Sequence, residues 1–322
     1  MKMDHQQPDL RVRLGPLELK NPVIAASGTF GYGEEYASLV DLNQIGAIVV
    51  KGLSLKPKSG NPPPRIVETN GGMLNAIGLA NVGVETFIRE KLPVLRKYDT
   101  RIIANIYGHH IDEYGDLASM LKGVEGIAAL EVNISCPNVE CGGMVFGVDP
   151  DVSARVTERV LKNTDKPVIM KLTPNVTDIR VIARAVESAG AHAISLINTL
   201  TGMAIDVDSR TPKLSNIYGG LSGPAIRPVA VFMVYQAASS VRIPVIGMGG
   251  IMDARDALEF IIAGASAVQV GTANFVDPAA TLDVLDGIRG YCEKHGIVRI
   301  EEIVGTLKTQ SKNISPAEAL RR

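Results

Sequence analysis

The chain carries a cysteine directly after a short apolar run, in the stretch 131–143. The run 129–135 has the composition of a buried strand, and Cys136 and Pro137 follow it. Proline cannot donate to a strand ladder and favours extended geometry in the residue before it, so we expect the chain to leave the sheet there. A thiol on a loop at a strand's carboxyl end is one way in which α/β enzymes present a catalytic group. The alternative is a small buried hydrophobe, the usual state of a free cysteine.

Polar side chains also stand at the ends of other apolar runs. Two of them are the lysines Lys51 and Lys171, and three are the asparagines Asn105, Asn133 and Asn198. A single lysine in such a place can bury its stem and extend its ammonium group to water. Two lysines and three asparagines at successive strand ends instead favour one shared site.

Glycines follow the last two apolar runs, as Gly249-Gly250 and Gly271-Thr272. Backbone N–H groups can approach a phosphate closely where no side chain intervenes. The other interpretation is a pair of tight turns. Phosphate binding here, with amide and ammonium groups opposite, indicates a phosphorylated cofactor.

These residues require a fold that brings strand ends together. Short runs rich in Val, Ile and Ala predict strands at 23–27, 47–51, 101–106, 129–135, 167–172, 193–198, 244–248 and 267–271. The stretches between and after them predict helices at 34–43, 84–98, 112–122, 151–163, 176–189, 224–240, 253–263 and 278–295. Eight strands alternating with eight helices predict an α/β fold of the (β/α)8 TIM barrel type, in which strand ends surround the active site. Residues 10–20 alternate around Gly15-Pro16 and predict an N-terminal β-hairpin.

A doubly wound sheet is the less favoured alternative. The sequence has no strand–Gly-x-Gly-x-x-Gly–helix unit for a dinucleotide. The longest connections, 52–83 and 199–223, both follow strands, so we expect them at the catalytic end of the barrel. We expect one domain over residues 1–322, with peripheral tails at 1–9 and 309–322.

Composition excludes several classes of protein. A net charge of -1, aromatic residues at 4% and no tryptophan argue against nucleic-acid binding. Three cysteines, Cys136, Cys141 and Cys292, favour a reducing compartment and are too few for an iron–sulfur cluster or, without suitably spaced histidines, a metal site. No apolar run reaches the ~18–20 residues of a membrane span, and no signal peptide is visible. We therefore expect a cytoplasmic protein without a membrane or metal site.

The sequence resembles the dihydroorotate dehydrogenases, which are flavin-containing barrels, over about residues 10–308. Asn-Ile-Ser-Cys-Pro-Asn at 133–138 and Asn-Ala-Ile-Gly-Leu at 75–79 together are highly specific. Further matches are the segments 21–31, 50–52, 72–74, 171–175, 197–199, 219–224, 247–251 and 270–272. The similarity is greatest to the catalytic subunit of the NAD-linked subclass, class 1B.

The resemblance implies FMN-dependent oxidation of (S)-dihydroorotate to orotate in de novo pyrimidine (UMP) biosynthesis. It implies that Cys136 is the general base and that Lys51 assists catalysis. The residues implied to bind substrate are Lys51, Asn75, Ala76, Ile77, Gly78, Leu79, Asn133, Asn198 and Thr199. Those implied to bind FMN are Ser27, Lys51, Gly52, Asn105, Asn133, Lys171, Ile197, Gly223, Gly249, Gly250, Gly271 and Thr272.

The resemblance also implies a partner that reoxidises the flavin. This would be an electron-transfer subunit with FAD and a two-iron iron–sulfur cluster, which passes electrons to NAD. The expected assembly is a heterotetramer of two catalytic and two electron-transfer subunits, built on a homodimer. The alternatives are the fumarate-linked class 1A enzyme, another pyrimidine-acting flavin barrel such as a dihydropyrimidine dehydrogenase domain or a tRNA-dihydrouridine synthase, and a phosphate-ligand binding barrel without activity.

Overall fold

The computed structural model describes residues 7–135, 137–138 and 144–309. Eight parallel strands form a closed barrel in chain order, since the last strand pairs with the first. They are β3 (Val23–Ala25), β4 (Ala47–Val49), β7 (Arg101–Ile106), β8 (Ile127–Asn133), β11 (Val168–Lys171), β12 (Ala193–Leu196), β17 (Val245–Met248) and β18 (Ala267–Val270). Most of their side chains are buried, as expected for strands covered on both faces. The predicted (β/α)8 barrel is therefore confirmed.

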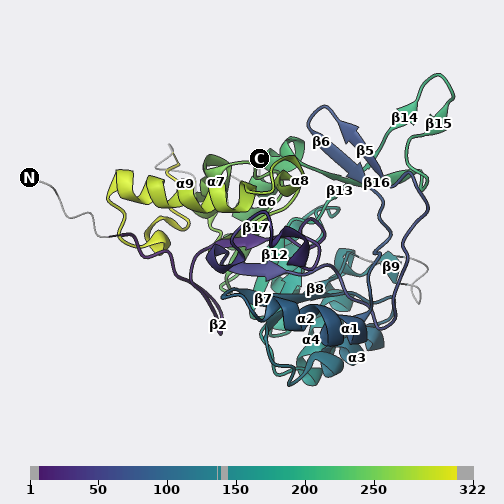
Figure 1. Ribbon diagram of the computed structural model, residues 1–322, viewed down its shortest axis with the longest axis horizontal. Helices are drawn as coiled ribbons and strands as arrows, with labels where there is room; N and C mark the ends of the chain where they lie inside the picture. The colour runs from purple at the N-terminus through teal and green to yellow at the C-terminus, as the bar shows by residue number, and fades with distance from the viewer. Residues whose placement is uncertain (1–6, 136, 139–143, 310–322) are drawn as a thin grey trace, which may run out of the picture.

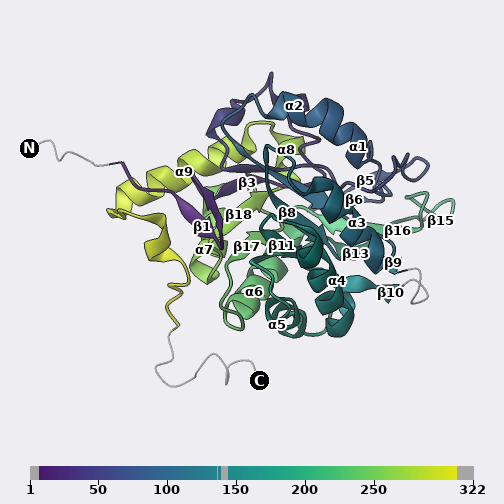
Figure 2. The same ribbon diagram turned by 90° about the horizontal axis from the view of Figure 1, so that it is seen from below.

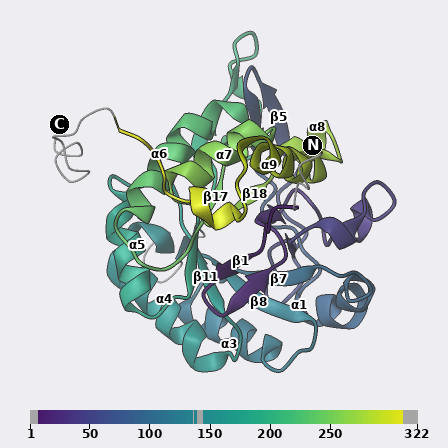
Figure 3. The same cartoon turned by 90° about the vertical axis from the view of Figure 1, so that its left-hand side faces the viewer.

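Helices surround the strands (Figures 2 and 3). The longer ones are α3 (Ile111–Leu121), α4 (Pro150–Asn163), α5 (Ile179–Ser188), α6 (Arg227–Ala238), α7 (Ala254–Ala263) and α9 (Ala280–His295). Residues 84–95 form a composite helix of α1 (Val84–Thr86), the π-turn η3 (Phe87–Lys91) and α2 (Leu92–Leu95). Aspartates begin three of these helices, because Asp149, Asp178 and Asp253 each accept a hydrogen bond from a backbone N–H of the first turn.

The helix predicted at 34–43 is wrong. This segment contains two short 3-10 turns, η1 (Glu34–Tyr36) and η2 (Leu42–Gln44). The ring of Tyr36 stacks on Phe30 with centroids 4.0 Å apart, and its hydroxyl donates to the backbone carbonyls of Thr29 and Asn274. These tertiary contacts fix the segment against the barrel and outweigh a weak helical pattern.

An N-terminal hairpin lies across one end of the barrel (Figure 3). Strands β1 (Val12–Leu14) and β2 (Leu17–Leu19) pair antiparallel, as predicted, around the Gly15-Pro16 turn. Their inward side chains are buried with the barrel core. The hairpin contacts the starts of the strands, since the Arg101 side chain donates to the backbone carbonyl of Glu18. It therefore closes the amino end of the barrel.

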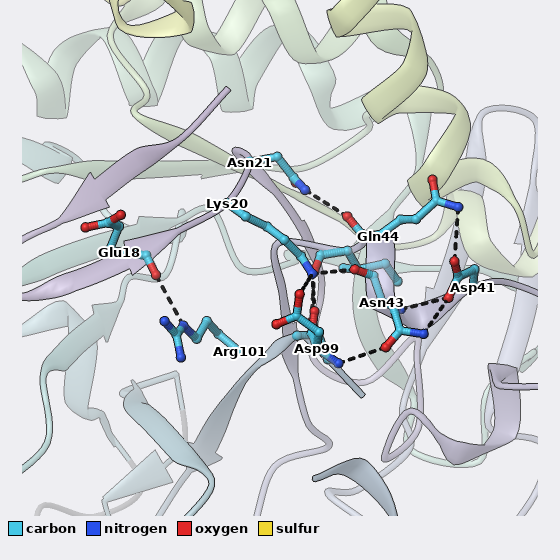
Figure 4. A network of polar contacts seen from close by, with 10 residues as sticks. Glu18, Lys20, Asn21, Asp41, Asn43, Gln44, Asp99 and Arg101 are labelled. Atoms are coloured by element: carbon cyan, nitrogen blue, oxygen red, sulfur yellow. Dashed lines mark hydrogen bonds and ion pairs between the residues drawn. The ribbon is translucent and has the colours of Figure 1, made fainter. Parts of the chain in front are cut away.

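A polar network joins this hairpin to the barrel wall (Figure 4). The ammonium group of Lys20 donates to the backbone carbonyls of Asn43 and Asp99, and it lies 3.0 Å from a carboxylate oxygen of Asp99. The backbone N–H of Asp99 in turn donates to the side chain of Asn43. The network ties the connection before β3 to those before β4 and β7.

The opposite, carboxyl end carries a separate sheet that projects from the barrel (Figure 1). The two long predicted connections supply its strands, in the order β13 (Leu200–Met203), β16 (Tyr218–Ser222), β6 (Gly72–Asn75) and β5 (Ile66–Thr69). A second hairpin, β14 (Ile205–Asp206) with β15 (Thr211–Pro212), extends beyond it. Both connections follow barrel strands, so the prediction that they lie at the carboxyl end is confirmed.

The remaining elements are short. They are β9 (Pro137–Asn138), β10 (Met144–Val145), η4 (Phe146–Val148), η5 (Pro224–Ile226), α8 (Ala273–Val276) and η6 (Ile300–Ile303). Within the described ranges, no helix has the length and apolar character needed to cross a membrane.

Candidate active site

A cavity of about 660 Å³ opens at the carboxyl end of the barrel. Its walls come from two sources, the ends of the barrel strands and the projecting sheet. Every site residue predicted from the sequence lines it except Gly223 and Cys136. Gly223 lies beside Gly250, while Cys136 lies outside the described residues. The fold therefore brings together side chains that are as far apart in the chain as Ser27 and Thr272.

The floor of the cavity contains one of the two lysines. Lys171 ends β11, and its ammonium nitrogen lies 3.4 Å from a carboxylate oxygen of the fully buried Glu131. The same oxygen accepts a hydrogen bond of 2.7 Å from the side-chain amide of Asn105. Lys171 and Asn105 therefore present groups to the cavity from fixed positions.

Lys51 is held differently. Its backbone N–H donates to the carbonyl of Gly31, and this places the residue just beyond the end of β4. Among the residues that the structure describes, no carboxylate forms an ion pair with its ammonium group. Lys51 thus brings a cation to the cavity wall that can pair with an anionic ligand.

Three polar residues form a rigid cluster where β8 and β12 end. The amide nitrogen of Asn198 donates to the side-chain oxygens of Asn133, at 3.2 Å, and of Ser135, at 2.9 Å. The side-chain oxygen Oδ1 of Asn133 also accepts a hydrogen bond from the backbone N–H of Ser135. The Oδ1 of Asn198 accepts one from the backbone N–H of Thr199. The cluster fixes the amide orientations, so a bound ligand meets a defined pattern of donors and acceptors.

The predicted substrate loop, residues 75–79, begins at the end of β6. The side chain of Asn75 donates to the backbone carbonyl of Gly220 in β16, at 3.2 Å. The amide of Asn81 donates to the backbone carbonyl of Leu79 and to the hydroxyl of Tyr107. These bonds hold both ends of the loop against neighbouring elements.

Directly after β17 the chain turns at Gly249 and Gly250, which have no side chains and form what we call the glycine corner. Gly250 has φ 79°, and a Cβ atom there would lie 2.8 Å from the carbonyl oxygen of Gly223 and 2.9 Å from the backbone nitrogen of Arg227. Arg227 forms an ion pair with Asp256 behind this corner. Close by, the hydroxyl of Thr272 donates to that of Ser222, at 2.8 Å. Gly249 and Gly250 line the cavity with backbone alone, and backbone N–H groups of this kind can bind an anion.

Sequence reasoning missed several residues of the cavity. Gln269 lines it from β18 and is buried, and its side-chain oxygen has no hydrogen-bond partner in the described part of the chain. Its nitrogen donates to Glu131, which underlies the floor. Both are polar residues inside otherwise apolar strands, and this feature of the sequence could have indicated that they belong to the site. Other residues that line the cavity but were not predicted as site residues are Thr173, Asn175, Thr201, Tyr218 and Met248.

Comparison with known proteins identifies the family. The dihydroorotate dehydrogenase family profile matches residues 9–291. A relative from Geotalea daltonii is 59% identical over 302 residues, covering 94% of this chain and 99% of its own length. A relative from Thermoanaerobacter sp. is 56% identical over 300 residues, covering 93% of this chain and 99% of its own. Both bear the name dihydroorotate dehydrogenase B (NAD(+)), catalytic subunit. The chain belongs to the dihydroorotate dehydrogenase family.

Proposed function

We propose that this chain catalyses the FMN-dependent oxidation of (S)-dihydroorotate to orotate, as a cytoplasmic enzyme of de novo pyrimidine biosynthesis. The observation that carries the proposal is the convergence of its strand-end lysines and asparagines on one cavity. The relatives that share more than half of its residues are named for the same activity and cover nearly its whole length.

The residues of the cavity fit FMN. A volume of about 660 Å³ lies within the usual range for cofactor sites. The glycine corner at Gly249-Gly250, with Gly223, Gly271 and Thr272, would hold the phosphate through backbone groups. The buried side-chain oxygen of Gln269, which has no hydrogen-bond partner among the described residues, supports a ligand with a hydrogen-bond donor over the floor. The residues that would contact the ring system are Ser27, Lys51, Gly52, Asn105, Asn133, Lys171 and Ile197. Bound FMN supplies the hydride acceptor.

The substrate would lie under the loop 75–79. Asn75, Asn133, Asn198 and Thr199 would form hydrogen bonds with its ring and carboxylate, and Lys51 would pair with its negative charge. Amides held as rigidly as those of Asn133 and Asn198 discriminate strongly, because an analogue without the matching group leaves them unpaired.

Oxidation removes a proton from carbon 5 of dihydroorotate and a hydride from carbon 6. Carbon 5 is alpha to a carbonyl group and only weakly acidic, so a base must take its proton. We assign this role to Cys136. The assignment rests on the family resemblance and on its neighbour Ser135, which lines the cavity and accepts a hydrogen bond from Asn198. Because a cation beside a thiol favours the thiolate, we propose that Lys51, which lines the same cavity as Ser135, assists this step.

The electrons would leave through a second subunit. The relatives are named catalytic subunits of an NAD-linked enzyme, which supports a separate electron-transfer subunit. We propose that this partner carries FAD and a two-iron iron–sulfur cluster, and that two copies of each subunit assemble around a homodimer of this chain.

Steady-state assays of the isolated chain test this proposal. With dihydroorotate, the FMN-loaded chain should reduce artificial dyes but not NAD, and co-expression with the partner should add NAD reduction. Efficient fumarate reduction would instead indicate the class 1A enzyme. Turnover of another dihydropyrimidine in preference to dihydroorotate would contradict the proposed substrate.

A further inference from the structure

A carboxylate lies fully buried beneath the cavity and receives four hydrogen bonds. One oxygen of Glu131 accepts from Asn105, at 2.7 Å, and from Lys171, at 3.4 Å. The other accepts from Ser195, at 2.9 Å, and from Gln269, at 2.7 Å. We call these five residues the Glu131 cluster. They come from β7, β8, β11, β12 and β18, so the cluster spans the interior of the barrel.

The cluster determines how the cavity floor is presented. Lys171, Asn105 and Gln269 line the cavity, whereas Glu131 and Ser195 do not. A carboxylate can only accept hydrogen bonds, so the amide nitrogens of Asn105 and Gln269 must face Glu131. Their carbonyl oxygens are then left as the acceptors for a ligand, and that of Gln269 has no partner in the described structure. The buried carboxylate therefore sets the donor and acceptor pattern of the floor.

The cluster also determines the charge of the floor. The side chain of Lys171 is 8% exposed and that of Glu131 is 0% exposed, so water screens the pair little. A ligand on the floor meets a lysine whose positive charge is partly balanced from below. Loss of the carboxylate would leave that charge unbalanced.

We propose that Glu131 is a positioning residue that lowers the reduction potential of the bound flavin by balancing Lys171 and orienting the amides of Asn105 and Gln269. The inference rests on the proposed function, because it requires a flavin on this floor. Reduction adds electron density to the flavin ring, and a more positive floor favours the reduced form. Glu131 keeps that preference moderate, which helps the reduced cofactor to pass its electrons on.

Potentiometric titration of the FMN-loaded protein tests the proposal. Glu131→Gln should still bind FMN. It should favour reduced over oxidised FMN about tenfold more than the wild type does, which raises the reduction potential of the bound FMN by about 30 mV for a two-electron couple. Glu131→Asp keeps the charge and should lie closer to the wild type. Ser195→Ala is the matched control, because it removes one bond to the same carboxylate without changing charge or the cavity lining. Its potential should stay near that of the wild type.

A variant that removes the positive charge of the pair, Lys171→Gln, tests the proposal without depending on how well Glu131→Gln folds. Lys171→Gln should lower the potential, and the double variant Glu131→Gln/Lys171→Gln, which leaves no buried charge unpaired, should return toward the wild type. An FMN-loaded double variant with the same potential as Lys171→Gln would overturn the inference and leave Glu131 a structural residue. Failure of the wild-type protein itself to bind FMN would instead overturn the proposed function.

Discussion

The two ends of the barrel differ in the residues that cover them and in what those residues do. At the amino end, Leu14, Leu17 and Leu19 of the hairpin are buried against the core. At the carboxyl end, the strands stop at lysine, asparagine and glycine, and two long connections surround a cavity. Residues at the amino end of the barrel therefore stabilise the fold, and residues at the carboxyl end form the site for chemistry.

The lysines at the two ends of the barrel have different partners. At the amino end, the ammonium group of Lys20 donates to two backbone carbonyls and pairs with Asp99, so its bonds join parts of the chain (Figure 4). At the carboxyl end, Lys51 and Lys171 line the cavity. Lys20 therefore stabilises the fold, whereas Lys51 and Lys171 line the space open to a ligand, although the ammonium group of Lys171 also lies 3.4 Å from Glu131. Substitutions at the two ends should therefore affect different measurements.

The largest expected effect concerns Cys136. Cys136→Ala should retain FMN and the unfolding temperature of the wild type but reduce turnover of dihydroorotate roughly 10²–10⁴-fold, the usual contribution of a general base. Stopped-flow measurement of flavin reduction checks this. Cys136→Ser should be slow near neutral pH and recover in part at higher pH, because a hydroxyl is harder to deprotonate. Turnover of Cys136→Ala near the wild-type rate would leave the thiol a packing residue.

A pair of glycine substitutions compares the two ends directly. Gly250 at the cavity and Gly123, in the turn between α3 and β8, both have positive φ, of 79° and 69°. The positive φ costs an alanine about 1 kcal/mol at either position. A Cβ atom at Gly250 would in addition lie 2.8 Å from the carbonyl oxygen of Gly223 and displace the backbone that lines the glycine corner, whereas a Cβ atom at Gly123 meets nothing within 4 Å. Gly250→Ala should purify with little FMN, whereas Gly123→Ala should remain yellow. Flavin absorbance per protein measures both, and equal FMN content would place the phosphate elsewhere.

Loss of Lys20 should have a smaller and purely structural effect. Lys20→Met keeps the apolar stem but removes the bonds to Asn43 and Asp99, which should lower the free energy of unfolding by about 1–2 kcal/mol. Urea denaturation measures this change. The KM for dihydroorotate and the FMN content should stay at wild-type values. A change in KM without a change in stability would contradict the separation of the two ends.

Much of this arrangement can be predicted from the sequence. The barrel strands follow from local apolar runs, and the site residues at their ends follow from the general geometry of the fold. The projecting sheet could not be predicted, because β6 and β16 pair across 145 residues of chain, as Asn75 and Gly220 do. The segment at 34–43 was mispredicted because the contacts of Tyr36 are tertiary.

The roles of the site residues were predictable only in part. Lys51, Asn133 and Lys171 stand at strand ends and were found by position. Glu131 and Gln269 stand inside strands, and their inward direction depends on the register of the closed barrel. The sequence also does not reveal that Lys171 pairs with Glu131, whereas Lys51 forms no ion pair with any residue of the described ranges.

The smallest expected effect lies at the amino end, at His192. Its ring nitrogen Nδ1 accepts a hydrogen bond of 3.0 Å from the backbone N–H of Val168, which requires an unprotonated Nδ1, and burial lowers the pKa of His192 below its ordinary value of 6.5. As the pH falls below about 6.5, the unfolded chain therefore takes up a proton before the folded chain does, and stability decreases.

His192→Asn offers an acceptor that does not titrate, so it should reduce the loss of stability between pH 7.5 and 5.5. Urea midpoints at the two pH values measure this, and an equal loss in both proteins would assign the pH dependence to other groups. Because His192 lies at the closed end of the barrel, FMN content should not change in either protein.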